Sequence, residues 1–162
     1  IGSAPRWKED TWHDNIIIRV DLICVVFLGG CIGTALRYAC SVIPDCGAFH
    51  IGTFAANMAA CFVYAALSAW LGGTRRTVGR AKEYVNRGCG MGMCGGLSTM
   101  STLALEEFTM LHDGKAMDCA AYCCTTFIVG CLLAYVGAHV GLRFAGTEHN
   151  DGDRHAMGKE AD

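Results

Sequence analysis

The sequence predicts an all-α integral membrane protein with four transmembrane helices, and three observations carry this prediction. Hydrophobic residues make up 52% of the 162-residue chain, whereas 17% of its residues are charged. Most of the charges lie near the two ends and in one central stretch. The rest of the sequence falls into four mostly uncharged windows, each about the 20 residues that a membrane-spanning helix needs, at 22–43, 51–73, 88–111 and 119–142.

These windows form one predicted transmembrane domain over residues 22–142, with a polar segment on either side. Residues 1–21 mix both charges with Trp7 and Trp12, which is typical of an amphipathic segment in the membrane interface. Residues 143–162 are polar and contain glycine, so we expect this tail to be disordered.

The first window, 22–43, contains small residues at helical spacing followed by a cation. Gly29 and Gly33 are four residues apart, which lets another helix approach closely. Arg37 follows one turn later, near the end of the window, where it either anchors the topology or braces a vestibule or a subunit contact.

The second window, 51–73, contains polar residues that recur on one helical face. Asn57 is the most informative, because an amide in hydrocarbon needs hydrogen-bond partners. Pore lining and an interhelical hydrogen bond both explain it. The complete stripe is Thr53, Asn57, Cys61, Tyr64 and Ser68.

The third window, 88–111, opposes an unbroken helix, because five glycines lead into four hydroxyl residues between Gly88 and Thr102. We predict a helix broken near its middle, whose freed carbonyls, amides and hydroxyls could handle an ion. The alternative is a glycine-rich packing surface that stays helical.

The fourth window, 119–142, has two recognisable faces. Tyr122, Thr126 and Gly130 recur at intervals of four and form a track that carries hydroxyls. Small residues form a ridge suited to close helix contact at Gly130, Ala134, Gly137 and Gly141.

Basic residues are distributed unevenly between the two expected sides of the membrane. Eleven of the 13 lie on the side of the termini and the central loop, and only Arg37 and Lys115 lie on the other. This bias predicts one fixed orientation in the cell membrane with both termini cytoplasmic. It also explains the basic link between the second and third windows without a nucleic-acid partner.

No catalytic centre is predicted, because the sequence has no P-loop, no Cys-x-x-Cys and no Ser/His/Asp set on polar loops. The chain is therefore not expected to be an enzyme. Its 11 cysteines lack metal-ligand spacing, which leaves soft-metal transport as a weak alternative. A proton-coupled four-span exporter is the main rival, although Glu106 and Glu107 lie toward the end of their window and no carboxylate is central.

Three motifs now occur in order along the chain. They are Gly29-Gly30-x-x-Gly33-Thr34-x-x-Arg37-Tyr38, Gly52-Thr53-x-x-x-Asn57, and Gly95-Gly96-Leu97-Ser98-Thr99-x-Ser101-Thr102 with Glu106. With this set, residues 22–142 resemble the CrcB/Fluc family of fluoride channels. The resemblance implies an antiparallel, dual-topology dimer with fluoride pathways at the subunit interface. It also implies a structural sodium ion at the dimer centre, held by backbone carbonyls.

Site residues follow from this resemblance by position. Gly95 and Ser98 match the carbonyls that hold sodium, and Arg37 and Glu106 are candidates for vestibule or structural roles. The amide and hydroxyl groups among the pathway residues could replace the water around fluoride without trapping it by charge. The implied fluoride pathway comprises Asn57, Thr99, Met100, Ser101, Thr102, Leu103, Tyr122 and Thr126.

Met100 and Leu103 depart from the family pattern, which has phenylalanine at both positions. A ring edge can face an anion, and neither a thioether nor an isobutyl group reproduces it. The expected function is therefore a fluoride-exporting channel subunit, or alternatively a non-conducting structural subunit of such a channel.

The charge bias also bears on assembly, because a chain that inserts one way cannot supply both members of an inverted pair. We expect a heterodimer with a homologous subunit of opposite orientation, in which at least one fluoride pathway is impaired. Small-residue ridges on the first and fourth spans are expected to provide its contact surfaces. A homodimer is the alternative.

Overall fold

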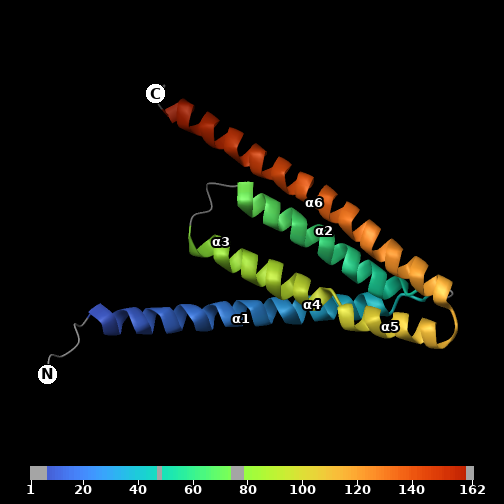
Figure 1. The fold of residues 1–162 in the computed structure, drawn as a ribbon. Helices are drawn as coiled ribbons and strands as arrows, with labels where there is room; N and C mark the ends of the chain where they lie inside the picture. The colour runs from blue at the N-terminus through green and yellow to red at the C-terminus, as the bar shows by residue number, and fades with distance from the viewer. Residues whose placement is uncertain (1–6, 47–48, 74–78, 160–162) are drawn as a thin grey trace.

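The computed structural model describes residues 7–46, 49–73 and 79–159, and describes side chains over 20–46, 49–73 and 79–146. This part of the chain is built from helices joined by short links, so the all-α class is confirmed for it (Figure 1). The elements are α1 (Trp7–Ser41), α2 (Ile51–Gly73), α3 (Arg80–Val85), the π-helix η1 (Asn86–Cys94), α4 (Gly95–Leu97), α5 (Met100–His112) and α6 (Ala116–Lys159).

Within the described residues, three helical segments are long and apolar enough to cross a membrane. They are Val20–Ser41 in α1, Ile51–Gly73 in α2 and Ala116–Gly146 in α6. The predicted windows 22–43, 51–73 and 119–142 overlie these segments. The predicted window 88–111 is not one helix, because it is divided among η1, α4 and α5.

Both outer helices extend beyond the predicted domain boundaries. Helix α1 begins at Trp7, so residues 7–21 continue directly into the first span and do not form a separate segment. Helix α6 continues to Lys159, so the expectation of a disordered tail from residue 143 is wrong for residues 143–159. A helix that is already nucleated extends at little cost, and no proline interrupts residues 116–159. Residues 1–6 and 160–162 lie outside the described residues.

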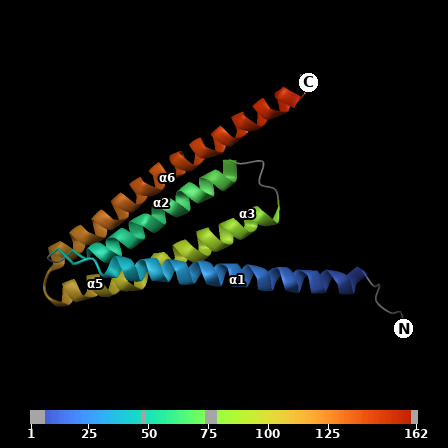
Figure 2. The same ribbon diagram turned by 180° about the vertical axis from the view of Figure 1, so that it is seen from behind.

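Helix α2 lies between α6 and the segment that runs from α3 to α5 (Figures 1 and 2). Helix α6 packs mainly on α2, while α1 packs mainly on η1 and α4. The N-terminal part of α1, the C-terminal part of α6 and the ends of α2 and α3 lie at one end of the molecule (Figure 1). The α1–α2 link and the α5–α6 turn lie at the other end.

The glycine ridges are buried inside the chain. A Cβ on Gly33 would lie 2.1 Å from the carbonyl oxygen of Met93 in η1, and one on Gly29 would lie 2.1 Å from that of Gly88. A Cβ on Gly141 would lie 2.1 Å from the carbonyl oxygen of Ala66 in α2. Since van der Waals packing draws the backbones of one chain this close, the expectation that these ridges contact a partner subunit is wrong.

Large apolar side chains cover the outer surfaces of α1, α5 and α6. Phe27 is 68% exposed, Phe108 65% and Phe144 64%. Surfaces of this kind face lipid or another subunit in membrane proteins. Lipid and a second subunit therefore have room on faces that the intrachain glycine contacts do not occupy.

Candidate functional site

The centre of the candidate site is an interruption of the helical path between α4 and α5. Ser98 has φ −73° and ψ 149°, and Thr99 has φ −147° and ψ 103°, so both residues are extended. Helix α5 then restarts with Thr99 as its N-cap, whose Oγ1 accepts a hydrogen bond from the Thr102 amide at 3.3 Å. A threonine followed by apolar residues favours this geometry, because the hydroxyl satisfies a free amide of the new helix.

Asn57 of α2 pairs with the extended backbone of Thr99. The Thr99 amide donates to Asn57 Oδ1 at 2.7 Å, and Asn57 Nδ2 donates to the Thr99 carbonyl at 3.4 Å. Asn57 is 7% exposed and Thr99 is 5% exposed, so both partners are buried. The structure therefore contains the interhelical hydrogen bond that was one of the two explanations for Asn57. Its role in a pathway stays a prediction.

The diverted amides leave two carbonyls without their helical donors. In an α-helix the Gly95 carbonyl would accept from the Thr99 amide, and the Ser98 carbonyl would accept from the Thr102 amide. The first amide donates to Asn57 and the second donates to the Thr99 hydroxyl. Gly95 and Ser98 are the two residues that sequence comparison by motif assigned to sodium, and their carbonyl oxygens suit a hard cation.

A groove of about 410 Å³ lies beside these two residues. Cys61 and Tyr64 from the polar stripe of α2 form part of its wall, together with Gly95 and Ser98. No heavy atom lies within 4 Å of a Cβ placed on Gly95, so this side of α4 is open in the single chain. A second subunit could therefore approach α4 from this side.

A second cavity beside the interruption, of about 310 Å³, is lined by several polar residues. Arg37, Tyr38 and Thr34 of α1 line it, opposite Thr53 of α2 and the Thr99–Thr102 turn. Thr99 Oγ1 also donates to Thr102 Oγ1 at 2.8 Å and lies 3.5 Å from Ser101 Oγ. Two of the predicted hydroxyl residues, Thr99 and Thr102, thus line the same cavity as Arg37, which combines a cation with neutral hydrogen-bond donors. The other three predicted hydroxyl residues, Ser101, Tyr122 and Thr126, are not among its described lining residues.

Glu106 joins three helices through two hydroxyl groups. Thr53 Oγ1 donates to its Oε1 at 2.5 Å, and the Tyr122 hydroxyl donates to its Oε2 at 2.9 Å. The Tyr122 hydroxyl also lies 3.3 Å from the His50 carbonyl. Sequence reasoning placed Thr53 on the polar face of α2 but did not connect it to Glu106. The sequence feature that marks Thr53 as a possible site residue is its position one helical turn before Asn57.

Tyr122 lies in an aromatic cluster beside this carboxylate. It is 1% exposed, and its ring packs edge to face on Phe49 at 4.8 Å between centroids. Leu103, which is 3% exposed, belongs to the same apolar cluster. The Thr126 hydroxyl donates to the Tyr122 carbonyl at 2.8 Å, so the predicted track on α6 is partly satisfied within the helix.

Met100 and Leu103 occupy different environments. Met100 is 64% exposed on the surface of α5, whereas Leu103 is buried. The sequence analysis treated both positions alike, as places where the family pattern has a phenylalanine ring and this chain has none. The structure separates them, because a side chain at 100 faces away from the chain and one at 103 must fit beside Tyr122.

Comparison with known proteins identifies the family. A family model described as "CrcB-like protein, Camphor Resistance (CrcB)" matches residues 24–138, which is more than half of the chain. The chain is 53% identical over 132 residues to "Fluoride-specific ion channel FluC 2" of Bifidobacterium longum, covering 82% of this chain and 74% of that protein. It is 31% identical over 127 residues to "Fluoride-specific ion channel FluC 2" of Bacillus subtilis, covering 78% and 92%.

A third relative, "Fluoride-specific ion channel FluC 1" of Staphylococcus aureus strain NCTC 8325, is 32% identical over 118 residues, covering 72% of this chain and 93% of the relative. All three matches cover most of both proteins. The resemblance that the motifs indicated is therefore confirmed, and the chain belongs to the CrcB-like family of membrane proteins.

Proposed function

We propose that the chain is a subunit of a fluoride channel in the cell membrane, and that the channel exports fluoride from the cytoplasm. The cavity beside the helix interruption carries this proposal, because its described lining residues include hydroxyls and the Arg37 guanidinium but no carboxylate. Fluoride holds its water tightly, so a pathway must offer donors in exchange. The names of the relatives support the same ion.

The proposed pathway uses donors on both sides of the interruption. Asn57 and the hydroxyls of Thr99, Ser101 and Thr102 lie at or beside it, and Arg37 would attract an anion into the cavity. Tyr122 and Thr126 would extend the pathway along α6. Glu106 accepts from Thr53 and Tyr122 and so sets the direction in which their protons point.

We further propose that a sodium ion binds to the backbone carbonyls of Gly95 and Ser98. Support comes from the two amides that donate to side chains and so leave these carbonyls free of their usual partners. Unwound carbonyls of broken membrane helices are suited to this ion. A bound cation would add a fixed positive charge near the pathway.

The proposed orientation places both termini in the cytoplasm. The uneven distribution of basic residues supports it, because the N-terminal part of α1, the C-terminal part of α6, the end of α2 and the start of α3 lie at the same end of the molecule (Figure 1). A reporter fused after Lys159 is expected to be active only on the cytoplasmic side. A large fraction of chains with the reporter outside would contradict a single orientation.

The proposed assembly is an antiparallel heterodimer with a homologous subunit. Eleven of 13 basic residues on one side make insertion in both directions unfavourable, so the inverted member must be another chain. The relatives are numbered FluC 1 and FluC 2, which suits a pair of related subunits. Open surfaces at Gly95 and Met100 are available for the contact.

Fluoride efflux from liposomes tests the function and the missing rings together. The chain co-expressed with its homologue is expected to conduct, and Met100→Phe is expected to raise the flux, because position 100 can present a ring edge toward a partner. Leu103→Phe is the comparison. It must enter the cluster around Tyr122, so it should lower the free energy of unfolding by about 1–3 kcal/mol without raising the flux.

Other outcomes of this experiment are equally informative. A stable, conducting dimer of this chain alone would contradict the heterodimer. Flux that is unchanged by Met100→Phe would show that methionine is tolerated at this position. If neither the co-expressed pair nor this chain alone conducts fluoride, the proposed ion is wrong.

A further inference from the structure

A second polar pocket lies at the opposite end of α2 from the cavity that Arg37 lines. It has a volume of about 550 Å³, between the end of α2 and the start of the α3–η1 segment. Helix α2 contributes Tyr64, Ser68 and Leu71, and the α3–η1 segment contributes Lys82, Asn86 and Arg87. None of these residues belongs to the proposed fluoride pathway, and only Tyr64 also lines the groove beside the proposed sodium site.

The pocket has a net positive charge. Glu83 also lines it, but its carboxylate pairs with the Arg87 guanidinium at 2.9 Å. Over residues 79–146, whose side chains are described, Lys82 makes no ion pair. Among the described side chains, the half-buried Lys82 is therefore the pocket's cation without a paired carboxylate, and it attracts an anion.

Neutral polar side chains line the same pocket as this cation. A Cβ on Gly90 would lie 3.2 Å from Asn86 Oδ1 and 3.5 Å from the Tyr64 ring, so Asn86 lies on the side of η1 that faces α2. The hydroxyls of Ser68 and Tyr64 complete the polar wall, and Leu71, which is 4% exposed, forms an apolar one. A cation with amide and hydroxyl donors suits an anion with several acceptor oxygens, as in a phosphate group.

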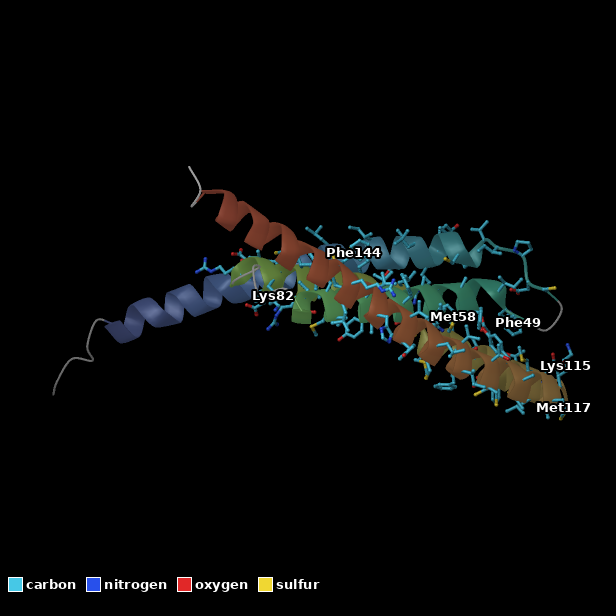
Figure 3. The ribbon with its side chains drawn as sticks, turned by 90° about the horizontal axis from the view of Figure 1, so that it is seen from above. Phe49, Met58, Lys82, Lys115, Met117 and Phe144 are labelled. Carbon is cyan, nitrogen blue, oxygen red and sulfur yellow. The ribbon has the colours of Figure 1, made fainter. Side chains whose placement is uncertain are left out.

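The position of the pocket indicates where such a phosphate comes from. The pocket lies where the apolar segment Ile51–Gly73 ends, which is the depth of lipid headgroups. Figure 3 shows Lys82 far from Lys115, which marks the other end of the molecule. Basic pockets between helices at this level are suited to anionic headgroups. We propose that this pocket binds the phosphate group of an anionic phospholipid, a role that does not depend on the proposed fluoride function.

Lipid binding to the purified full chain, with any subunit that co-purifies, tests this site. Short-chain phosphatidylglycerol is titrated into the detergent-solubilised protein, and bound lipid is counted by native mass spectrometry. Lys82→Gln is expected to weaken binding about fivefold, the effect of removing one basic residue at an anionic surface. Arg80→Gln is the matched control, because it removes the same charge from the same short helix but does not line the pocket.

Three further arms decide the outcome. Lys82→Arg keeps the charge and is expected to retain binding, which guards against a folding defect in Lys82→Gln. Phosphatidylcholine of the same chain length is expected to bind more weakly, because it carries no net charge. Inorganic phosphate that displaces the lipid at equal concentration would assign the pocket to a free ion and overturn the lipid source. Equal binding by Lys82→Gln and Arg80→Gln would overturn the site itself.

Discussion

Replacement of Asn57 by aspartate is expected to reduce fluoride flux through the assembled channel by about 100-fold or more. Aspartate can still accept from the Thr99 amide, but it cannot donate to the Thr99 carbonyl as Asn57 Nδ2 does. It also places a negative charge where an anion is proposed to pass. Two like charges about 4 Å apart repel by about 4 kcal/mol at an effective dielectric constant of about 20, which exceeds the roughly 2.7 kcal/mol that a 100-fold change requires.

Fluoride efflux from proteoliposomes measures this effect, with size-exclusion elution as the check on assembly. Asn57→Leu removes both hydrogen bonds without adding charge, so a smaller loss of flux in this variant would separate charge repulsion from loss of the donors. Thr109→Val is the control, because the Thr109 hydroxyl bonds only to Leu105 of its own helix at 2.8 Å. An Asn57→Asp channel with unaltered flux would mean that the pathway does not pass this residue.

Gly33→Ala is expected to destabilise the chain by about 3 kcal/mol, near the upper end of the usual cost of overpacking. The added Cβ would lie 2.1 Å from the Met93 carbonyl oxygen and 2.9 Å from the Leu97 amide nitrogen. Both contacts are with backbone, so no side chain can move away. Helix α1 would have to separate from η1 and α4, and Arg37 would move with it, one turn further along α1.

Thermal unfolding followed by fluorescence-detected size exclusion measures the shift in detergent. Gly146→Ala is the matched control, because no heavy atom lies within 4 Å of a Cβ at that position in α6. It is expected to leave the midpoint unchanged or slightly higher, since alanine is the better helix former. If Gly33→Ala and Gly146→Ala unfold at the same temperature, the close contact between α1 and η1 does not contribute to stability.

Asn57→Asp and Gly33→Ala both act on the helix interruption at Ser98 and Thr99, one from α2 and the other from α1. Glycine packing brings α1 against η1 and α4, which places Arg37 beside the interruption. Asn57 approaches from α2 and takes the Thr99 amide, which keeps the backbone extended. The helix interruption therefore depends on both neighbours, because an exposed break in an apolar environment would leave unsatisfied backbone groups.

Much of the fold was evident in the sequence, because membrane spans depend on length and hydropathy alone. The window 51–73 coincides with α2, and the windows 22–43 and 119–142 overlie the apolar parts of α1 and α6. The polar stripe on α2 could also be predicted, since residues four apart share a helical face in any environment. The resemblance to the CrcB/Fluc family could also be seen in the sequence, because it rests on three short motifs that occur in order along the chain.

Partners in space were decided only by the tertiary structure. The glycine ridges predicted close helix contact, but their pattern is the same whether the second helix belongs to this chain or to another, and here it belongs to this chain. Thr53 and Tyr122 meet at Glu106 although they are 69 positions apart (122 minus 53), because α2, α5 and α6 converge there. Local sequence determines which groups a helix carries on each face. Only the packing of the helices determines which of those groups satisfy one another and which, like the Gly95 and Ser98 carbonyls, lose their usual helical donors.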